Sequence, residues 1–231
     1  MSRDLPSSVG AIVVAAGRSR RMDGIDKLWT SLARPGEPKP LLAYPLAAFE
    51  ACPSVSRVVL VVSEETVERA RSLVLDEALD KVRAVVPGGE RRQDSVRAGL
   101  DALGGCDWVA IHDGARPLVT VELIEQGLLE ARETGASCPV LPVADTVKEI
   151  DEAGFAVHTL QRARLRLAQT PQVFRYDLLL EAHRQAGDEA TDDAAMVEAL
   201  GVRVRLFPGT RRNVKVTTPE DLALVHALLT P

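Results

Sequence analysis

The stretch Val9-Gly-Ala-Ile-Val-Val-Ala-Ala-Gly-Arg-Ser-Arg-Arg-Met22 joins an apolar run to a turn of small and cationic residues. Its first six residues are almost all apolar, which is typical of a strand covered on both faces of a parallel sheet. Ala15, Ala16 and Gly17 let the backbone approach a ligand, and cationic side chains follow as far as Lys27. A strand that ends in such a turn predicts phosphate binding at the carboxyl edge of a sheet.

Similar runs recur along the chain, with helix-period segments between most of them. The runs rich in β-branched residues are Arg57–Val62, Val82–Val86, Trp108–Ile111, Ser137–Val143 and Val202–Phe207. Strands that alternate with helices of about ten to fifteen residues form parallel sheets with right-handed crossovers. We therefore predict an α/β fold, a single domain over residues 1–231 with a Rossmann-like, doubly wound and mostly parallel sheet.

Two helices near the end of the chain have marked boundaries. Thr218 is a predicted N-cap, followed by Pro219 at the first helical position and acidic residues in the first turn. Thr191 is predicted to cap a second helix, which Gly201 ends. The apolar stripe of this second helix is Met196, Val197 and Leu200.

One segment interrupts the alternation of strands and helices. Val147–Ile150, the turn Asp151–Gly154 and then Phe155–Leu160 predict a β-hairpin. A lone two-stranded hairpin is marginal in water, so it must pack against its own domain or against a second subunit. We favour the second option and predict that residues 141–162 form a protruding β-arm for dimerisation.

The overall composition excludes some classes of partner. The net charge is -5, the pI is near 5.5 and aromatic residues make up 3% of the chain, so a broadly basic surface for nucleic acid is not expected. The apolar run that starts at Val9 is far shorter than the roughly 18 residues of a membrane-spanning helix. We predict a cytoplasmic protein that binds neither nucleic acid nor membrane.

The metal-binding residue types show no ligand spacing. The cysteines are Cys52, Cys106 and Cys138, and the histidines are His112, His158, His183 and His226. Widely separated cysteines fit reduced thiols in a cytosolic chain, and these histidines lack the spacing of a zinc site. A protein-bound zinc ion is therefore not expected.

The turn after the first strand differs from two well-known phosphate-binding motifs. It contains neither the G-x-G-x-x-G of dinucleotide-binding proteins nor the G-x-x-x-x-G-K-[ST] of P-loops. Neither of those mechanisms therefore applies. A solvated, charged turn remains the alternative interpretation of its arginines.

A second glycine turn follows the third predicted strand. The stretch Pro87–Val96 opens a helix, and Gly88 and Gly89 expose backbone groups that can read the edge of a base. Arg92 and Ser95 can donate hydrogen bonds to the base or to phosphates. With Glu90 they are candidate substrate-binding residues, while a simple capped turn is the alternative.

The third stretch, Ile111–Pro117, delivers Asp113 and Arg116 to the carboxyl edge of the sheet. A carboxylate placed there beside phosphates suits a magnesium ion or a ribose hydroxyl. An internal ion pair between Asp113 and Arg116 explains the same pattern. Both interpretations stay open at this point.

Two further pieces, Thr170–Phe174 and Asn213–Thr217, complete an ordered set of motifs. The set reads A-A-G-x-x-x-R-M, G-G-x-x-R-x-x-S-V, H-D-x-A-R-P, D-T-V-K, T-P-Q-x-F, T-D-[DE]-A and N-x-K-V-T. It resembles the 2-C-methyl-D-erythritol 4-phosphate cytidylyltransferase family of the non-mevalonate isoprenoid pathway. The resemblance extends from Ala15 to the last helix, and the ordered set is far more specific than any single motif.

The resemblance implies an activity and a fold. Members transfer CMP from CTP to 2-C-methyl-D-erythritol 4-phosphate, with release of pyrophosphate and with Mg²⁺ or another divalent cation present. The implied fold is of the nucleotide-diphospho-sugar transferase type. The implied assembly is a homodimer in which the arm reaches across the two-fold axis, which would place Arg162 near the second subunit's site.

The family's functional positions can be carried over to this chain. Arg21 and Lys27 match the basic loop that grips the triphosphate, and Lys215 matches a lysine at the reacting phosphates. Asp113 matches an acidic position of the nucleotide site. The positions near the cytosine are Gly88, Gly89 and Ser95, and those for the sugar phosphate are Arg116, Thr146, Arg162 and Thr170.

The sequence departs from the family pattern near the phosphate loop. Asp26 precedes the loop lysine where many members have proline, and Leu32–Lys39 form a longer loop. This leaves Lys27 and Lys39 as candidates, and we prefer Lys27 because it is closer to the glycine turn. Gly114 replaces a common alanine, which is expected to loosen the backbone without removing a ligand.

Two other functions remain as alternatives. The chain could be a cytidylyltransferase for ribitol 5-phosphate or another polyol phosphate, since only the acceptor half of the site would differ. It could also be a non-catalytic sensor that binds CTP. A dehydrogenase is excluded because the glycine fingerprint of dinucleotide binding is missing.

Overall fold

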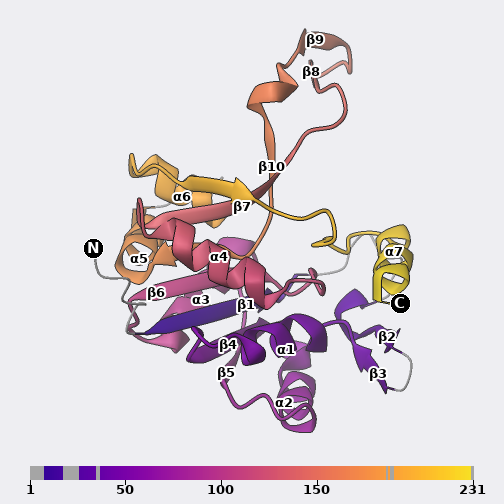
Figure 1. The fold of residues 1–231 in the computed structure, drawn as a ribbon, viewed down its shortest axis with the longest axis vertical. Helices are drawn as coiled ribbons and strands as arrows, with labels where there is room; N and C mark the ends of the chain where they lie inside the picture. Colours follow the sequence, from indigo (N-terminus) through magenta and orange to yellow (C-terminus); the bar gives the residue numbers. More distant parts are fainter. Residues whose placement is uncertain (1–7, 18–25, 35–36, 186, 188–189, 230–231) are drawn as a thin grey trace.

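An eight-stranded sheet forms the centre of the molecule, with helices on both faces (Figure 1). The computed structural model describes residues 8–17, 26–34, 37–185, 187 and 190–229. A two-stranded arm extends from the sheet at one side. The last helix lies on the opposite side of the body from α5 and α6.

The strands agree closely with the predicted runs and add several short ones. They are β1 (Val9–Ala15), β2 (Ser31–Arg34), β3 (Glu37–Pro40), β4 (Arg57–Val62), β5 (Val82–Pro87), β6 (Trp108–Asp113), β7 (Ala136–Pro142), β8 (Lys148–Ile150), β9 (Ala156–Thr159), β10 (Arg166–Ala168), β11 (Gln172–Arg175) and β12 (Arg205–Pro208).

The helices include seven α-helices and three short 3-10 helices in the described part of the chain. The α-helices are α1 (Ala43–Ala51), α2 (Val67–Asp76), α3 (Arg92–Leu103), α4 (Val121–Ala131), α5 (Tyr176–Gln185), α6 (Asp193–Ala199) and α7 (Pro219–Leu229). The 3-10 helices are η1 (Lys27–Trp29), η2 (Glu64–Thr66) and η3 (Arg162–Arg164).

The strand order of the central sheet is β10-β7-β11-β6-β1-β4-β5, and β12 pairs with β7. β1 runs parallel to both of its neighbours, with Ile12 opposite Val59 of β4 and Ile111 of β6. β4 with β5 and β7 with β12 are also parallel, whereas β10 and β11 run antiparallel to their neighbours. The predicted mostly parallel α/β sheet is confirmed.

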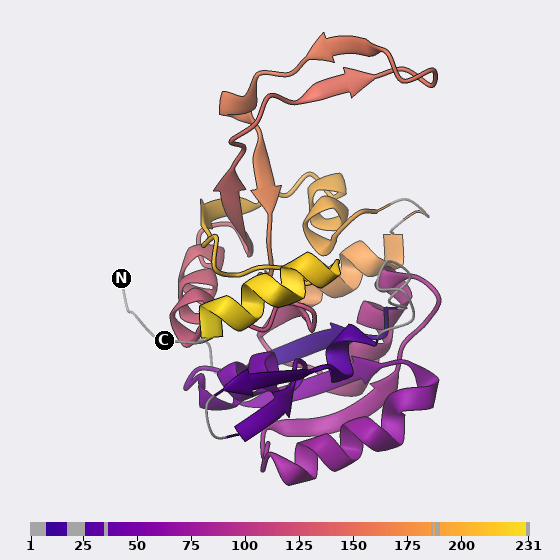
Figure 2. The ribbon, with the colours of Figure 1, turned by 90° about the vertical axis from the view of Figure 1, so that its right-hand side faces the viewer.

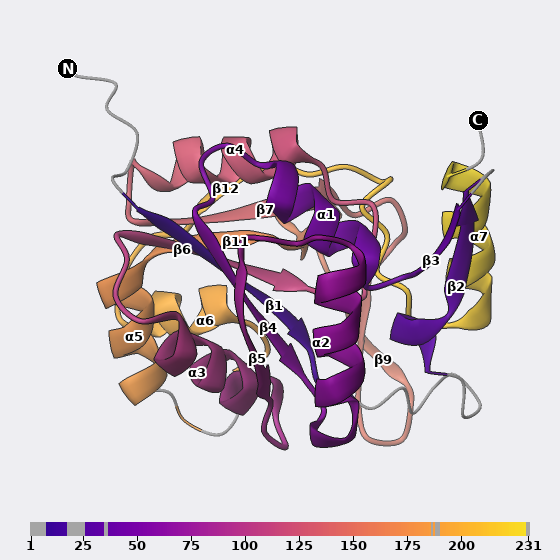
Figure 3. The same ribbon diagram turned by 90° about the horizontal axis from the view of Figure 1, so that it is seen from below.

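Both faces of β1 are buried, as its apolar sequence predicts. Ala11 and Val13 belong to a core that includes residues of α1 and α4, while Ile12 belongs to a second core with residues of α3, α5 and α6. Figure 3 shows these two groups of helices on opposite sides of the sheet. Each fully buried aliphatic side chain contributes about 1.5–3 kcal/mol, so the two cores fix the direction of β1 and of the turn that follows it.

The helix boundaries are confirmed for α7, and one cap is corrected for α6. α7 begins at Pro219. The cap of α6 is Asp192, not Thr191, because the Asp192 carboxylate accepts a hydrogen bond from the backbone N–H of Ala195 at 2.9 Å. Adjacent residues can both cap a helix, so the sequence did not distinguish them. Gly201 follows the helix with φ of +78°.

The predicted hairpin exists as the antiparallel pair β8–β9, which stands away from the body (Figure 2). Gly154 in its turn has φ of +86°, a conformation that glycine adopts without strain. The side chains of Ile150, Phe155 and Val157 are 62%, 73% and 52% exposed. The arm therefore presents apolar side chains that its own chain does not cover.

The segment Leu32–Lys39 is not the long loop that we expected. Ser31–Arg34 and Glu37–Pro40 pair as the antiparallel strands β2 and β3. The pair lies beside α7 (Figure 3), although α7 is far from these strands in the sequence. Leu32 is fully buried, which explains why these residues form a packed ribbon instead of an open loop.

Candidate functional site

A pocket of about 890 Å³ opens at the carboxyl edge of the parallel strands. We call it the edge pocket. It is lined by residues that follow β1, β4 and β5, by Asp113 at the end of β6, and by Lys27 and Lys215. Its predicted members are Ala15, Ala16, Gly17, Lys27, Gly88, Gly89, Glu90, Arg92, Ser95, Asp113 and Lys215. Its size is that of ordinary small-molecule sites.

The glycine turn after β5 packs directly on the turn after β1. A Cβ placed on Gly88 would meet the Cβ of Ala16 and would lie 2.5 Å from Ser95 Oγ. Ser95 Oγ accepts a hydrogen bond from the backbone N–H of Gly89 at 3.2 Å. The turn is also capped, since the Asp94 carboxylate accepts a hydrogen bond from the Arg91 backbone N–H at 3.1 Å and forms an ion pair with the Arg91 guanidinium. The capped-turn interpretation is therefore correct, and the same turn lines the pocket.

Lys27 is held at the pocket by the 3-10 helix η1. The Asp26 side chain caps this helix by accepting a hydrogen bond from the Leu28 N–H at 3.2 Å. Leu28 and Trp29 are buried, and the Arg69 guanidinium lies 4.3 Å from the centroid of the Trp29 ring. Asp26 thus has a structural role as the cap of the helix that carries Lys27.

Of the two candidate loop lysines, Lys27 lines the edge pocket. Lys39 lies on β3 outside the pocket lining, and its Nζ is 2.5 Å from Glu77 Oε2. The preferred candidate is therefore the one that the fold brings to the site. Arg21, the other predicted catalytic residue of this loop, lies outside the described residues.

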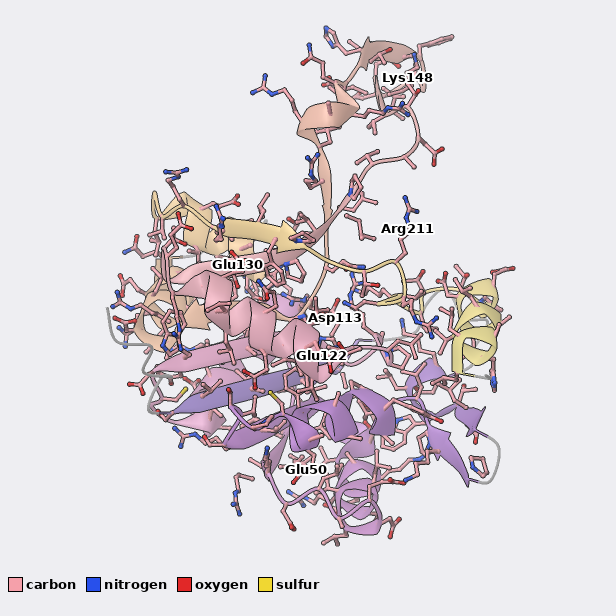
Figure 4. The ribbon with its side chains drawn as sticks, viewed as in Figure 1. Glu50, Asp113, Glu122, Glu130, Lys148 and Arg211 are labelled. Carbon is pink, nitrogen blue, oxygen red and sulfur yellow. The ribbon has the colours of Figure 1, made fainter. Side chains whose placement is uncertain are left out.

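Asp113 lies in a cluster of cations at the end of β6, near the middle of the body (Figure 4). Its Oδ2 is 2.8 Å from Lys215 Nζ and 3.8 Å from Arg116 Nε, and its Oδ1 accepts a hydrogen bond from Arg92 Nε at 3.3 Å. Burial raises the pKa of the Asp113 carboxyl, but the charges of Arg92 and Lys215 outweigh burial and hold that pKa far below its usual range. Asp113 is therefore an anion that both forms ion pairs and lines the pocket.

A buried hydrogen-bond network supports the backbone at Asp113. The Thr170 hydroxyl accepts a hydrogen bond from the Asp113 N–H at 3.0 Å and lies 3.1 Å from His112 Nδ1. His112 Nε2 lies 3.1 Å from the Arg116 carbonyl oxygen. Burial lowers the pKa of His112 to about 4, so the imidazole is neutral at pH 7, with Nε2 donating and Nδ1 accepting. Thr170 thus lies behind Asp113 instead of on the pocket wall.

The segment that carries Lys215 is tied to the same network. Asn213 is fully buried, and its side-chain amide donates to the Thr170 carbonyl oxygen at 2.7 Å. The Asn213 carbonyl oxygen accepts a hydrogen bond from Arg116 Nη1 at 2.8 Å. These bonds fix the backbone two residues before Lys215, so its ammonium reaches Asp113.

The structure separates the remaining predicted residues from the pocket wall. Arg116 is buried behind Asp113 and does not line the edge pocket. Thr146 and Arg162 are exposed at the base of the arm, and the Arg162 guanidinium donates a hydrogen bond to the Ala144 carbonyl oxygen. Neither arm residue lines the pocket of its own chain.

A comparison with known protein families shows to which family the chain belongs. A family model for 2-C-methyl-D-erythritol 4-phosphate cytidylyltransferase matches residues 9–231. The chain belongs to this family.

Relatives and solved structures agree with membership of the cytidylyltransferase family. A 2-C-methyl-D-erythritol 4-phosphate cytidylyltransferase of Dehalococcoides mccartyi is 47% identical over 225 residues, which cover 97% of each chain. The crystal structure of the enzyme of that name from Thermus thermophilus is 34% identical, with a TM-score of 0.75, and the match covers 96% of this chain and 98% of that one. The predicted nucleotide-diphospho-sugar transferase type of fold is confirmed by such structures.

Several pocket residues were missed by the sequence analysis. They are Val14, Leu28, Ser63, Glu64, Glu65, Arg91, Ala115 and Thr217. Ser63, Glu64 and Glu65 directly follow β4, and the carboxyl ends of neighbouring parallel strands share one edge of a sheet. Strand order was the signal that could have found them, because no glycine turn marks this stretch.

The described ranges hold no group of three or more histidine, cysteine, aspartate or glutamate side chains arranged to bind a metal ion. Within the same ranges, every helix is too short or too polar to cross a membrane.

Proposed function

We propose that this chain transfers CMP from CTP to 2-C-methyl-D-erythritol 4-phosphate, giving 4-diphosphocytidyl-2-C-methyl-D-erythritol and pyrophosphate. The proposal rests on one observation. In this member of the family, the edge pocket brings together a glycine turn, Lys27, Asp113 and Lys215. Residues 1–231 act as one nucleotidyltransferase domain. The reaction takes place in the cytoplasm, where the free cysteines of the chain stay reduced.

The chemistry needs positioned charge more than a general base. A phosphate oxygen of the acceptor attacks the α-phosphorus of CTP, and the bond from that phosphorus to the bridging oxygen breaks as pyrophosphate leaves with the electron pair. A phosphate monoester is already a nucleophile at neutral pH, so orientation and charge neutralisation supply the catalysis. Arg21 and Lys27 hold the triphosphate, and Lys215 contacts the reacting phosphates.

Recognition of the nucleotide falls to the two packed turns. Backbone groups of Ala15–Gly17 and Gly88–Gly89 approach the ligand closely because their side chains are small. The side chains of Glu90, Arg92 and Ser95 line the same wall of the pocket. Asp113 accepts a hydrogen bond from a ribose hydroxyl or faces a divalent cation.

The residues of the pocket fit Mg²⁺, or another divalent cation, that enters with CTP. Mg²⁺ in such sites keeps several waters and binds one or two carboxylates together with substrate phosphates. Asp113 is the buried carboxylate of the described lining, and Glu64, Glu65 and Glu90 are exposed. Asp113 would therefore hold the ion, which supplies charge neutralisation at the phosphates when bound.

The arm of residues 141–162 completes a homodimer in this proposal. Exposed Ile150, Phe155 and Val157 pack against a second copy, because a two-stranded hairpin alone is marginally stable. Thr146 and Arg162 then contribute to binding of the sugar phosphate, and the buried Arg116 and Thr170 support the same site from behind Asp113. Light scattering at assay concentration is expected to give the mass of a dimer, and a monomer would contradict this part of the proposal.

The acceptor is tested by pyrophosphate release with CTP and each candidate in turn. Release with 2-C-methyl-D-erythritol 4-phosphate is expected. Release with ribitol 5-phosphate alone would favour a polyol-phosphate cytidylyltransferase. Binding of CTP without release with any acceptor would indicate a sensor.

The phosphate-gripping residues give the matched mutational test. Lys27→Ala and Arg21→Ala are each expected to lower turnover about 10²–10³-fold, the usual cost of removing one preorganised charge contact. Lys39→Ala is the control, since Lys39 contacts Glu77 outside the pocket lining. Activity of Lys27→Ala within about threefold of the parent, less than 1 kcal/mol, would overturn the assignment.

A further inference from the structure

A buried carboxylate behind the edge pocket is connected to its wall through one arginine. Arg92 Nη1 donates a hydrogen bond to Asp193 Oδ2 at 2.7 Å, and Arg92 Nε donates to Asp113 Oδ1 at 3.3 Å. Arg92 and Asp113 line the pocket, whereas Asp193 is fully buried at the start of α6. One guanidinium therefore bridges a carboxylate of the site and a carboxylate outside it.

The second oxygen of Asp193 is also occupied. His183 Nε2 on α5 lies 3.0 Å from Asp193 Oδ1, and both side chains are almost inaccessible, at 3% and 0% exposure. The contacts run from His183 through Asp193 and Arg92 to Asp113 and then to Lys215. We call the first four of these residues the charge bridge.

Asp193 keeps its charge inside the protein. Burial alone would raise the pKa of its carboxyl, but the charge of Arg92 and the hydrogen bond from His183 hold that pKa below its usual value. A buried carboxylate without partners is costly, so Asp193 strongly favours one position of the guanidinium. The planar fork of arginine then transmits that position to Asp113.

Helix α6 does not need Asp193 as its cap. Asp192 caps the helix through Ala195, and it also accepts a hydrogen bond from Gln172 Nε2 at 2.7 Å. Both oxygens of Asp193 contact side chains from other elements, α3 and α5. The contacts of Asp193 thus point toward the pocket side chain Arg92 and not toward its own helix.

We propose that Asp193 is a positioning residue for the nucleotide pocket, which orients Arg92 and through it Asp113 without touching a substrate. The inference rests on the proposed function in taking CTP as the ligand of the edge pocket. It assigns a use to the T-D-[DE]-A motif, which the mechanism above leaves unexplained. Loss of the negative charge at Asp193 should weaken CTP binding and leave binding of the acceptor nearly unchanged.

The first test is Asp193→Asn, which keeps the size of the side chain and removes its charge. The dissociation constant for CTP, measured by calorimetry, is expected to rise about 10-fold to 100-fold, as for loss of a hydrogen bond to a charged group. The KM for the acceptor is expected to stay within about threefold, since no contact with the acceptor is lost. Unchanged CTP affinity in a folded Asp193→Asn protein would overturn the proposal.

Asp192→Ala is the matched control on the same helix. It removes the cap of α6 and the contact to Gln172, so the midpoint of thermal unfolding should fall. Its CTP affinity, measured well below that midpoint, should equal that of the wild type. Equal losses of CTP affinity in Asp192→Ala and Asp193→Asn would show a general effect of α6 stability and would overturn the positioning role.

Arg92→Lys keeps the proposal testable if Asp193→Asn does not fold. Lysine retains the charge but lacks the fork that bridges two carboxylates, so CTP affinity should fall to a similar extent. Wild-type CTP affinity in Arg92→Lys would contradict the charge bridge.

The double variant tests whether the two residues act together. When Asp193→Asn is added to Arg92→Lys, little further loss of CTP affinity is expected, whereas fully additive losses would show that the two residues act independently.

Binding and turnover separate this inference from the proposed reaction. A wild-type protein that binds CTP but releases no pyrophosphate with any acceptor would refute the reaction, while the calorimetry with CTP would still test Asp193. A wild type that does not bind CTP would refute both.

Discussion

The edge pocket and the arm are built in opposite ways. At the pocket, Asp113 is held by Arg92 and Lys215, and the turn at Gly88 packs on that at Ala16. On the arm, the apolar side chains are exposed, and Lys148 lies at its far end, well away from Asp113 (Figure 4). The edge pocket is thus organised by contacts within one chain, whereas the apolar side chains of the arm are left uncovered by their own chain. In the proposed dimer a second chain covers them.

The first prediction concerns Lys215, which pairs with Asp113 in the edge pocket and is proposed to contact the reacting phosphates. Lys215→Ala should lower kcat about 10²–10³-fold while the protein stays folded, because a preorganised charge is lost. Steady-state kinetics and circular dichroism measure the two quantities. Arg211→Ala is the control, since Arg211 is exposed on the same segment and outside the pocket lining. Equal losses in both variants would show that the whole segment had moved.

The second prediction concerns pH and the buried network behind Asp113. Between pH 6.5 and about 4 the unfolded His112 binds a proton that the folded His112 does not, so the free energy of unfolding falls as the pH is lowered through this window. The loss is about 3 kcal/mol over the full window. Urea denaturation at several pH values should show a flatter dependence in His112→Gln. His158→Gln, on the exposed arm, should keep the parent's dependence, and identical curves for all three proteins would exclude the role of His112.

The third prediction tests whether Arg162 at the base of the arm acts in the pocket of the second subunit or in that of its own subunit. Lys27→Ala and Arg162→Ala should each be poorly active alone. After subunit exchange in a mixture, half of the dimers carry one intact site, so about a quarter of wild-type activity should return. A mixture of Lys27→Ala with Lys215→Ala, two defects in one pocket, should recover nothing. No recovery in the first mixture would place Arg162 in the site of its own subunit.

Much of the fold could be predicted because the information is local. A few neighbouring residues are enough to predict some elements. Examples are the apolar run that starts at Val9, the turn at Gly154 and the helix start at Pro219. The strands β10 and β11 were missed because their pairing depends on β6 and β7, which lie far away in sequence.

The candidate site shows the same limit. The glycine turns and Asp113 are recognisable from their neighbours in the sequence. Glu64 and Glu65 line the pocket only because β4 lies beside β1. The contact between Arg92 and Asp193 joins residues 101 positions apart, so no local pattern could reveal it.

The close packing at Gly88 has a consequence for inhibition. Any side chain there would collide with Ala16 and Ser95, and so would push two turns of the edge pocket apart. An inhibitor that hydrogen-bonds to the backbone of this turn would bind a surface that few single substitutions can change without loss of activity. Resistance by replacement of Gly88 should therefore be rare.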